Sequence, residues 1–323
     1  MSTHTGSSRL VSPAELVALR DRLVGLDDIT SPVVVGCSGG PDSLTLLAVA
    51  CDLGLAPIAV HVDHGLRDGS AAEGDVVAAA AQRLGARVEQ RSVEVGAGAN
   101  LEARARDARY RALEGAAREH GASAVLVGHT ADDQAETILL ALLRGSGSAG
   151  LAGMPVRRDL IVRPLLKLRR AETEACCASL GLDPVRDPTN DDRAYRRAWI
   201  RHEVLPLLAS GAARDLVPVL TRQADVLRDE SEYLDALARA AWPPDDHHAP
   251  ADVLDRLPRP LARRAVRCWL GSPPPSLHEV ERVLAVARRD ARATELAGGR
   301  RVRRTRGELI VDDGRRGDGG RGE

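Results

Sequence analysis

Phenylalanine is absent from this 323-residue sequence, and aromatic residues make up only 2% of it. The core must therefore be built mainly from alanine, valine and leucine, and stacking platforms for nucleic-acid bases cannot be numerous. Lysine is nearly absent too, since Lys167 is the single lysine among many arginines. We attribute this bias to genome composition and give it little functional weight.

Long apolar runs, paired cysteines and a large net charge are also missing. No segment approaches the ~20 apolar residues that span a bilayer, and the N-terminus has no signal-peptide core, so we expect neither secretion nor a membrane partner. Five cysteines without CxxC spacing favour a reduced, cytoplasmic location. A net charge of −1 leaves any RNA contact to local basic patches.

The composition is that of a folded globular protein, and the length suits two domains. From Ser31 to about Leu180, short β-branched runs alternate with helical stretches, which predicts a doubly wound, Rossmann-like α/β fold with a parallel sheet. The predicted strands are Val33 to Cys37, Pro57 to Val62, Arg87 to Val93 and Ala124 to Gly128. The predicted helices are Ser43 to Leu53, Ser70 to Leu84, Leu101 to His120 and Ala131 to Arg144.

From about Trp199 the pattern changes to helices broken by prolines, and it ends in a predicted hairpin that turns at Arg306 and Gly307. We therefore expect a smaller, mainly helical C-terminal domain. The predicted organisation is an N-terminal helical extension (1–30), an α/β domain (31–210), a helical accessory domain (211–312) and a disordered tail (313–323).

The most informative segment is VVVGCSGGPDSLTLL, a buried strand followed by Ser38 to Ser43 and a helix. Two glycines allow backbone N–H groups to approach an anion, and the helix N-terminus adds partial positive charge, so this turn predicts a pyrophosphate cradle. It lacks the lysine of a Walker A loop and the GxGxxG pattern of dinucleotide sites. Asp42 inside such a turn is interpreted as a Mg²⁺ contact, with a helix-capping carboxylate as the alternative.

Two later strand ends carry further polar residues. PIAVHVDHGLR brings His61, Asp63 and His64 toward the end of the second strand, where open α/β sheets bind ligands. A solvated helix start is the alternative there. After Gly128, Asp133 and Glu136 lie three residues apart on one face of a helix, without an obvious internal cation. They suit an amine or a metal, or else they only complement the helix dipole.

These motifs resemble known families. SGGPDS resembles the PP-loop of ATP pyrophosphatases, which cleave ATP between its α- and β-phosphates. GHTADDQAET with RGSGSAGLAGM, and EARARDARYRAL upstream, are similar to the signatures of tRNA(Ile)-lysidine synthases. RPLL, RDPTN (186–190) and IRHEVLPLL further on also look like that family, and the C-terminal region matches it more weakly.

The resemblance implies a two-step ligation on the wobble cytidine of a CAU-anticodon isoleucine tRNA, with ATP, Mg²⁺ and free lysine. The reaction adenylates the C2 oxygen and then replaces AMP by the lysine ε-amine, which makes lysidine. The resemblance assigns catalysis to Asp42, Arg109, Asp133 and Glu136. It assigns ATP binding to Ser38, Gly39, Gly40, Pro41, Asp42, Ser43, His61 and Gly128, Mg²⁺ to Asp42, and substrate binding to Asp133, Glu136, Arg144 and Arg201.

The resemblance further implies a lid at Arg144 to Gly153, for which a plain linker is the alternative. We expect RNA contacts from arginines in 193–201 and 300–306, although a solvated face is the more common role of any one arginine. RAWIR departs from the RNxIR-like run of the family, so an asparagine contact is missing. Longer members have an additional C-terminal domain, and from the resemblance we expect a single helical accessory domain here; a homodimer is compatible with the sequence.

Three other functions compete with this one. A PP-loop tRNA thiolase would use a sulfur carrier or paired cysteines, whereas Cys176 and Cys177 are adjacent in a predicted helix and point apart. A glutamine-dependent amidase would need a glutaminase domain. A nucleotide-binding regulator or RNA scaffold without turnover would have no need of the Asp133 and Glu136 pair.

Overall fold

The computed structural model describes residues 14–63, 65, 70–96, 101–185, 196–244 and 247–312. The predicted tail (313–323) and the RDPTN segment (186–190) lie outside these residues. The chain divides into two compact units, Met1–Asp225 and Val226–Glu323. No single helix in the described part is long and apolar enough to cross a membrane; one bent pair, Arg196–Ala212 with Val217–Ala241, meets the criteria of length and composition alone.

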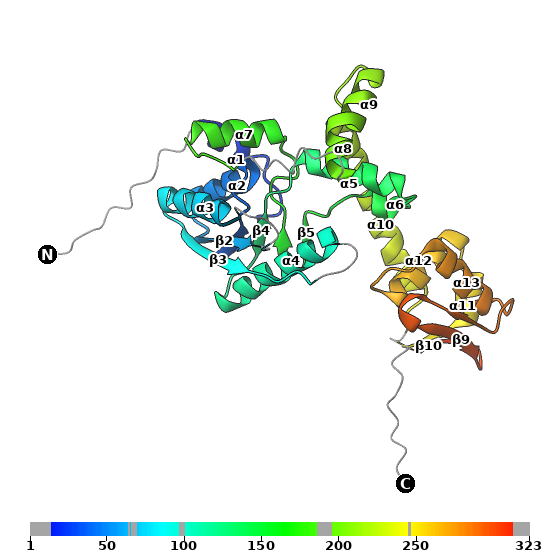
Figure 1. Cartoon of the computed structure of the whole chain (residues 1–323). Helices are drawn as coiled ribbons and strands as arrows, with labels where there is room; N and C mark the ends of the chain where they lie inside the picture. Colours follow the sequence, from blue (N-terminus) through cyan, green and yellow to red (C-terminus); the bar gives the residue numbers. More distant parts are fainter. Residues whose placement is uncertain are drawn as a thin grey trace, which may run out of the picture. The chain divides into compact units, whose positions relative to one another are not determined.

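The first unit contains a six-stranded sheet in the order β3-β2-β1-β4-β6-β5 (Figure 1). All neighbouring strands run parallel except β5, which pairs antiparallel with β6 at one edge. The strands are β1 (Val33–Gly36), β2 (Pro57–Asp63), β3 (Arg87–Ser92), β4 (Val125–Val127), β5 (Arg157–Arg158) and β6 (Ile161–Val162). The predicted parallel α/β fold is confirmed, but β5 and β6 were not predicted because two-residue strands show no periodicity.

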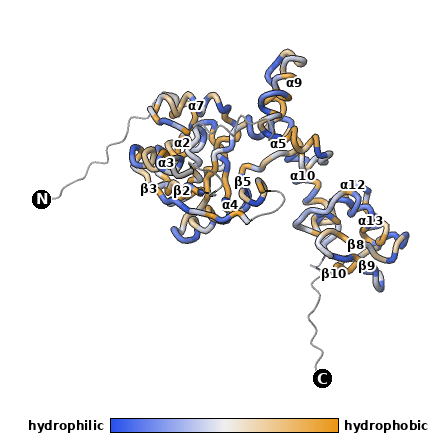
Figure 2. Tube along the Cα trace, viewed as in Figure 1, coloured by the Kyte–Doolittle hydropathy of each residue, from blue (hydrophilic) through white to orange (hydrophobic). Residues whose placement is uncertain are grey.

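Helices cover both faces of this sheet. They are α1 (Ala14–Arg20), α2 (Pro41–Asp52), α3 (Ser70–Leu84), α4 (Leu101–Glu119) and α7 (Arg170–Ser179). Two further helices, α5 (Ala131–Leu143) and α6 (Ser148–Leu151), follow β4 and pack against each other. Val33 and Val35 of β1 pack with residues of α1, α2, α3 and α7, whereas Val34 packs with residues of α4. Because β1 is buried on both faces, it reads as a continuous apolar run, and Figure 2 shows the central strands as hydrophobic stretches.

The strand order indicates where this sheet can bind a ligand. β1 pairs with β2 on one side and with β4 on the other. The chain runs outward from β1 through β2 to β3 and then crosses back to β4 on the other side of β1, so the strand order reverses between β1 and β4. Open α/β sheets bind ligands at such a switch point, outside the carboxyl ends of the strands. The segments that follow β1 and β4 are residues 37–40 and 128–130, which hold the predicted glycine turn and the start of the Asp133 helix. The topology therefore brings these two motifs together.

After α7 the chain continues in helices. Within the described residues these are α8 (Arg196–Trp199), a π-helical turn η2 (Ile200–Val204), α9 (Leu205–Ala212) and α10 (Val217–Ala241). Val217 and Leu220, at the start of α10, pack with Ala131 and Ala135 of α5 and with Leu205. This small apolar cluster fixes the helices after α7 against the helix that carries Asp133 and Glu136.

The second unit has its own core of helices and a small antiparallel sheet. Its helices are α11 (Ala251–Arg256), α12 (Arg259–Leu270) and α13 (Leu277–Ala287), with a 3₁₀ turn η3 (Ala297–Gly299). The sheet order is β7-β10-β9-β8, formed by β7 (His248–Pro250), β8 (Ala293–Glu295), β9 (Arg301–Thr305) and β10 (Glu308–Asp312). The predicted hairpin about Arg306 and Gly307 is confirmed, while the three-residue strands β7 and β8 were not predicted.

Candidate functional site

The turn after β1 is shaped by its own side chains. Gly39 has φ +82, and a Cβ there would lie 3.0 Å from Cγ2 of Val185. The Ser43 hydroxyl donates to the carbonyl oxygen of Gly40 at 2.9 Å and accepts from the amide of Ser38 at 3.3 Å. Pro41 begins α2, where its missing N–H costs nothing. The N-terminus of a 12-residue helix thus meets a preformed glycine turn, an arrangement that binds phosphate groups.

Gly128 supports this turn from the neighbouring strand. A Cβ at Gly128 would lie 3.0 Å from the carbonyl carbon of Asp42 and 3.1 Å from the amide nitrogen of Ser43. These atoms belong to the backbone and cannot swing aside as a flexible side chain could. Gly128 is therefore required for the close approach of β4 to the start of α2, which gives this predicted ATP-binding residue a structural reason.

Asp42 is a buried carboxylate with incomplete compensation. Thr173 of α7 donates its hydroxyl to Oδ1, and Nε of Arg170 lies 3.8 Å from Oδ2. The pKa of Asp42 is raised to about 7, first by burial and then by the charge of Asp133, while Thr173 and Arg170 oppose the change. The positive charge of Arg170 is therefore not enough to offset the burial of Asp42.

His61 lies at the end of β2 and is 4% exposed. Its Nδ1 lies 3.0 Å from the carbonyl oxygen of Cys37, which can only accept, so we assign the proton to Nδ1. The Nε2 atom is buried and has no hydrogen-bond partner among the described residues. An unpartnered ring acceptor beside the glycine turn suits a bound group with an N–H or O–H donor, such as the adenosine of ATP.

Asp133 serves two purposes at the N-terminus of α5. Its Oδ2 caps the helix, because it accepts the amide of Thr130 at 2.8 Å and the Thr130 hydroxyl at 3.0 Å. Its Oδ1 accepts from Nη2 of Arg170 at 3.0 Å. Burial would raise the pKa of Asp133, but the charge of Arg170 and the hydrogen bond from the Thr130 amide oppose it, and the pKa lies below its usual range. The alternative role of Asp133 at the start of the helix therefore accounts for one oxygen and leaves the other facing the site.

Glu136 follows one turn later and has no exposed surface. Its Oε1 accepts from Nε of Arg201 at 2.7 Å, and Nη2 of Arg170 lies 3.5 Å away. Its Oε2 is buried without a partner in the described part of the chain. A buried carboxylate with one unsatisfied oxygen can take one more donor, such as an ammonium group.

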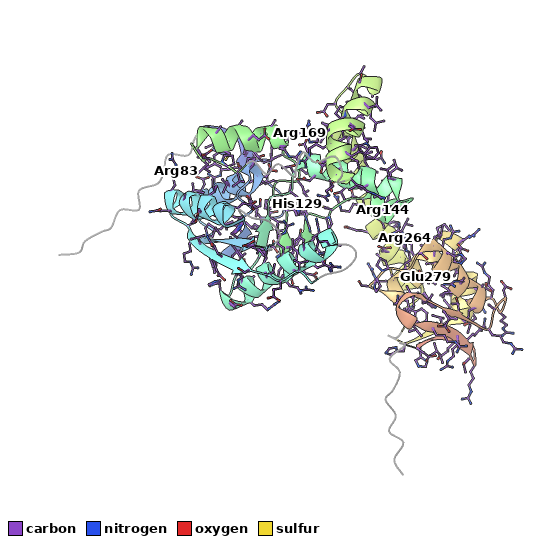
Figure 3. All side chains as sticks on the ribbon, viewed as in Figure 1. Arg83, His129, Arg144, Arg169, Arg264 and Glu279 are labelled. Carbon is purple, nitrogen blue, oxygen red and sulfur yellow. The ribbon has the colours of Figure 1, made fainter. Side chains whose placement is uncertain are left out.

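The expectation that no internal cation faces Asp133 and Glu136 is wrong, because Arg170 and Arg201 both do. Arg170 was not predicted as a site residue, yet its guanidinium reaches Asp42, Asp133 and Glu136. Its neighbour Arg169, labelled in Figure 3, instead pairs with two other carboxylates, those of Asp132 and Asp215. Arg170 thus connects the glycine turn to the carboxylate pair.

Two predicted site residues have no contact with this network among the described residues. The Arg109 guanidinium lies over the ring of Tyr110, with its carbon 5.6 Å from the centroid. Arg144 ends α5 and is exposed, and no hydrogen bond or ion pair of its side chain is present in the described ranges. Two hydrogen bonds fix the end of the loop that follows Arg144. The Gln134 side chain donates to the Met154 carbonyl oxygen at 2.9 Å and accepts a hydrogen bond from the Met154 amide at 2.7 Å.

A cavity of about 220 Å³ opens beside the carboxylate pair. Its polar wall includes Glu136, Arg170 and Arg201, while Leu205 and Val217 form part of an apolar wall. Asp215 and Arg169 provide a further pair of opposite charges along its lining. A ligand with an amine at one end, an aliphatic stem and a zwitterionic head would meet matching chemistry here.

The described residues hold no cluster of three or more histidine, cysteine or carboxylate side chains that could bind a metal by themselves. Mg²⁺ commonly binds through one or two carboxylates together with substrate phosphates, so a three-residue cluster is not required. The raised pKa of Asp42, caused first by burial and then by Asp133, is the property that a divalent cation would correct. Asp42 therefore fits a Mg²⁺ contact that is completed by ATP.

The arginines of the C-terminal hairpin are largely engaged within their own unit. Arg300 donates to the carbonyl of Leu270 at 2.6 Å, and Arg304 donates to that of Ala287. Arg303 pairs with Asp312 at 2.9 Å. An RNA contact from 300–306 stays a prediction, and it would have to draw on side chains that already have these partners.

Comparisons with known proteins agree with this geometry. A family model described as a PP-loop domain matches residues 19–208. The chain is 43% identical over 318 residues to the tRNA(Ile)-lysidine synthase of Thermobifida fusca (strain YX), covering 94% of this chain and 96% of that one. It is 48% identical over 239 residues to the tRNA(Ile)-lysidine synthase of Mycolicibacterium paratuberculosis (strain ATCC BAA-968 / K-10), covering 73% of each.

A solved structure shares the fold. The U34-tRNA thiolase NcsA from Methanococcus maripaludis superposes with a TM-score of 0.55 at 18% identity, covering 66% of this chain and 78% of that chain. This likeness concerns the arrangement of the backbone only.

Proposed function

The chain belongs to the tRNA(Ile)-lysidine synthase family, and from this premise we propose that it ligates lysine to C2 of the wobble cytidine in a CAU-anticodon isoleucine tRNA. ATP, the isoleucine tRNA and free lysine are its substrates. One observation carries the assignment of the site: Asp42 beside the glycine turn and the Asp133 and Glu136 pair converge on Arg170. This convergence supports a phosphate-binding end that lies next to an amine-binding end.

We propose that the turn from Ser38 to Ser43 binds the phosphates of ATP during the first step. The C2 oxygen of cytidine attacks the α-phosphorus, the bond to the β-phosphate breaks, and pyrophosphate leaves. Backbone amides at the start of α2 stabilise the negative charge that develops on the phosphates. His61 accepts a donor of the adenosine at Nε2, and Gly128 keeps the turn in place.

We propose that Asp42 holds Mg²⁺ together with ATP. Bound there, Mg²⁺ would offset the negative charge of the phosphates. The carboxylate of Asp42 is kept in position by the hydroxyl of Thr173, which reaches it from α7.

In the second step the lysine ε-amine attacks C2, and AMP leaves with the oxygen that was adenylated. We propose that the lysine side chain lies in the cavity, with its stem against Leu205 and Val217 and its amine at Glu136. Asp133, which shares Arg170 with Glu136 but does not line the cavity, is proposed as the second carboxylate for this amine. The amine must lose a proton to attack, and these carboxylates are the nearest acceptors. Arg170 and Arg201 limit the negative charge around the amine, which would otherwise favour its protonated form.

The roles of three other arginines are proposals of the same kind. We propose that Arg109 acts near the reacting centre and that Arg144, exposed at the end of α5, contacts RNA beside a lid formed by 144–153. Arg201 is proposed to contact substrate while it holds Glu136. The predicted domain limits, the cytoplasmic location and the homodimer stay predictions; light scattering of the purified chain tests the last of them.

The test is a reaction of the full chain with ATP, Mg²⁺, lysine and a matched tRNA transcript. We expect pyrophosphate release from the adenylation step, and AMP together with a new nucleoside of lysidine mass after digestion only when lysine is present. A thiolated nucleoside formed with a sulfur donor would favour the thiolase instead. ATP binding without any turnover would favour a nucleotide-binding regulator.

A further inference from the structure

Several arginines gather around one tyrosine at the end of the sheet that carries the site. Tyr110 of α4 is 7% exposed. Arg106 donates from Nη2 to its hydroxyl at 3.4 Å, and the Arg106 guanidinium carbon lies 5.2 Å from the ring centroid, close to the 5.6 Å of Arg109. Arg163, which follows β6 and is 2% exposed, also interacts with the Tyr110 hydroxyl. We call Arg106, Arg109 and Arg163 the Tyr110 cluster.

The Tyr110 cluster lacks negative charge. None of its three arginines forms an ion pair with a carboxylate in the part of the chain that the structure describes. Nε of Arg163 is buried without a partner, although Nη1 donates to the carbonyl of Pro155 at 2.9 Å. Burial lowers the pKa of Arg106, and the charges of Arg197, Arg109 and Arg163 lower it further. Guanidinium groups that lie this close together without a carboxylate partner repel one another, so binding of an anion between them is favourable.

The Tyr110 cluster also borders the carboxylate pair. His129, labelled in Figure 3, directly precedes the helix cap Thr130 at the end of β4. Burial lowers its pKa to about 3; Asp133 opposes this, while Arg106 and the rest of the Tyr110 cluster add to it. The imidazole is therefore neutral, and its Nδ1 is buried without a partner in the described residues. Arg197 donates to Thr137 at 3.2 Å, one turn beyond Asp133.

We propose that the Tyr110 cluster, with Arg197 beside it, binds a backbone phosphodiester of the tRNA next to the cytidine that is modified. The proposal rests on the proposed function and deepens it by giving the RNA its own anchor. The phosphates of ATP already have the glycine turn and the N-terminus of α2. Planar guanidinium forks suit the two free oxygens of a phosphodiester, and a fixed backbone would hold the extruded base between the ATP site and the amine site.

The test compares full-length Arg106→Gln with Arg111→Gln. Arg111 is exposed on the same helix, so its variant loses the same charge outside the cluster. Binding of the CAU-anticodon tRNA transcript is measured by filter retention between 50 and 200 mM salt, the range over which phosphate contacts weaken visibly. We expect roughly ten-fold weaker binding for Arg106→Gln and a salt slope reduced by about one, as for the loss of one phosphate contact. The KM for ATP should stay unchanged.

Two further variants test whether charge explains the effect and whether a second arginine shows it. Arg106→Lys should restore the salt slope, because it keeps the charge. If Arg106→Gln does not fold, Arg197→Gln provides the same comparison from α8. Equal tRNA binding by Arg106→Gln and Arg111→Gln overturns the proposal. A raised KM for ATP with unchanged tRNA binding also overturns it and assigns the cluster to the triphosphate.

The proposed function and the proposed RNA contact of the Tyr110 cluster are tested by different measurements. If the unmodified chain makes no lysidine, the ligase assignment is wrong, yet the comparison of the two variants in tRNA binding still decides whether the Tyr110 cluster contacts RNA.

Discussion

Arg201 donates its Nε–H to Oε1 of Glu136 at 2.7 Å, and Glu136 has no exposed surface. A carboxylate buried this completely needs partners for both oxygens, yet Oε2 has none in the described residues. Arg201 thus satisfies one half of the group and leaves the other half for a ligand. This division explains how a buried carboxylate can be held by one partner and still remain open to an incoming amine.

Glu136→Gln should impair the use of lysine far more than adenylation. The amide keeps the shape of the side chain but cannot bind an ammonium by charge, and the loss of a charged hydrogen bond is worth about 1.5–3 kcal/mol, or ten- to a hundred-fold in KM for lysine. The measurement is lysine-dependent lysidine formation beside pyrophosphate release without lysine. Exposed Glu203→Gln, two residues after Arg201, is the control. An unchanged KM for lysine would show that Glu136 does not bind it.

Arg170→Gln should destabilise the first unit more than Arg169→Gln. Arg170 lies 3.0 Å from Oδ1 of Asp133 and faces Asp42 and Glu136 as well, so its loss leaves buried carboxylates uncompensated. Removing one partner of a buried ion pair costs about 3–5 kcal/mol, whereas a partly exposed pair contributes about 1 kcal/mol or less. Urea unfolding of both variants measures the difference. Equal losses would mean that Arg170 does not hold the carboxylates together.

The sequence could predict the site only as far as local patterns reach. The glycine turn, Asp42 and the Asp133 and Glu136 pair each follow a strand that has a clear apolar run. Arg170 contacts Asp133, which lies 37 residues earlier in the sequence, and the apolar periodicity of the sequence cannot predict such a contact. One signal was available: two arginines at the start of a helix oppose the helix dipole, which indicates that carboxylates from elsewhere in the fold neutralise them.

Gly128→Ala should weaken ATP binding and lower stability. The added Cβ would lie 3.0 Å from the carbonyl carbon of Asp42, so β4 or the start of α2 must shift. We expect a loss of about 1–3 kcal/mol in unfolding free energy, the usual cost of overpacking, and a higher KM for ATP. Gly211→Ala in α9 is the control, because a Cβ there has no neighbour within 4 Å. Similar ATP binding by both variants would contradict the close approach of β4 to the turn.

Asp42→Asn should stabilise the ligand-free protein in a way that depends on pH. Burial, followed by the charge of Asp133, raises the pKa of Asp42 from 3.8 to about 7, so the folded protein binds a proton that the unfolded chain has released. The group's contribution to stability is therefore complete below pH 3.8 and is lost as pH rises through 7. The gain from Asn should be small at pH 4.5 and reach about 2–4 kcal/mol near pH 8.

Urea unfolding at pH 4.5, 6 and 8 with a chelator present measures this gain, and Asp107→Asn on the surface of α4 controls for the loss of an exposed carboxylate. The same Asp42 substitution should abolish adenylation, because an amide cannot hold Mg²⁺ as a carboxylate does. If Asp42→Asn is more stable above pH 7 but no longer adenylates, the charge of Asp42 that destabilises the fold is the charge that adenylation requires. A gain that is the same at all three pH values would mean that Asp42 is already compensated in the ligand-free protein, and the reason for placing Mg²⁺ there would be lost.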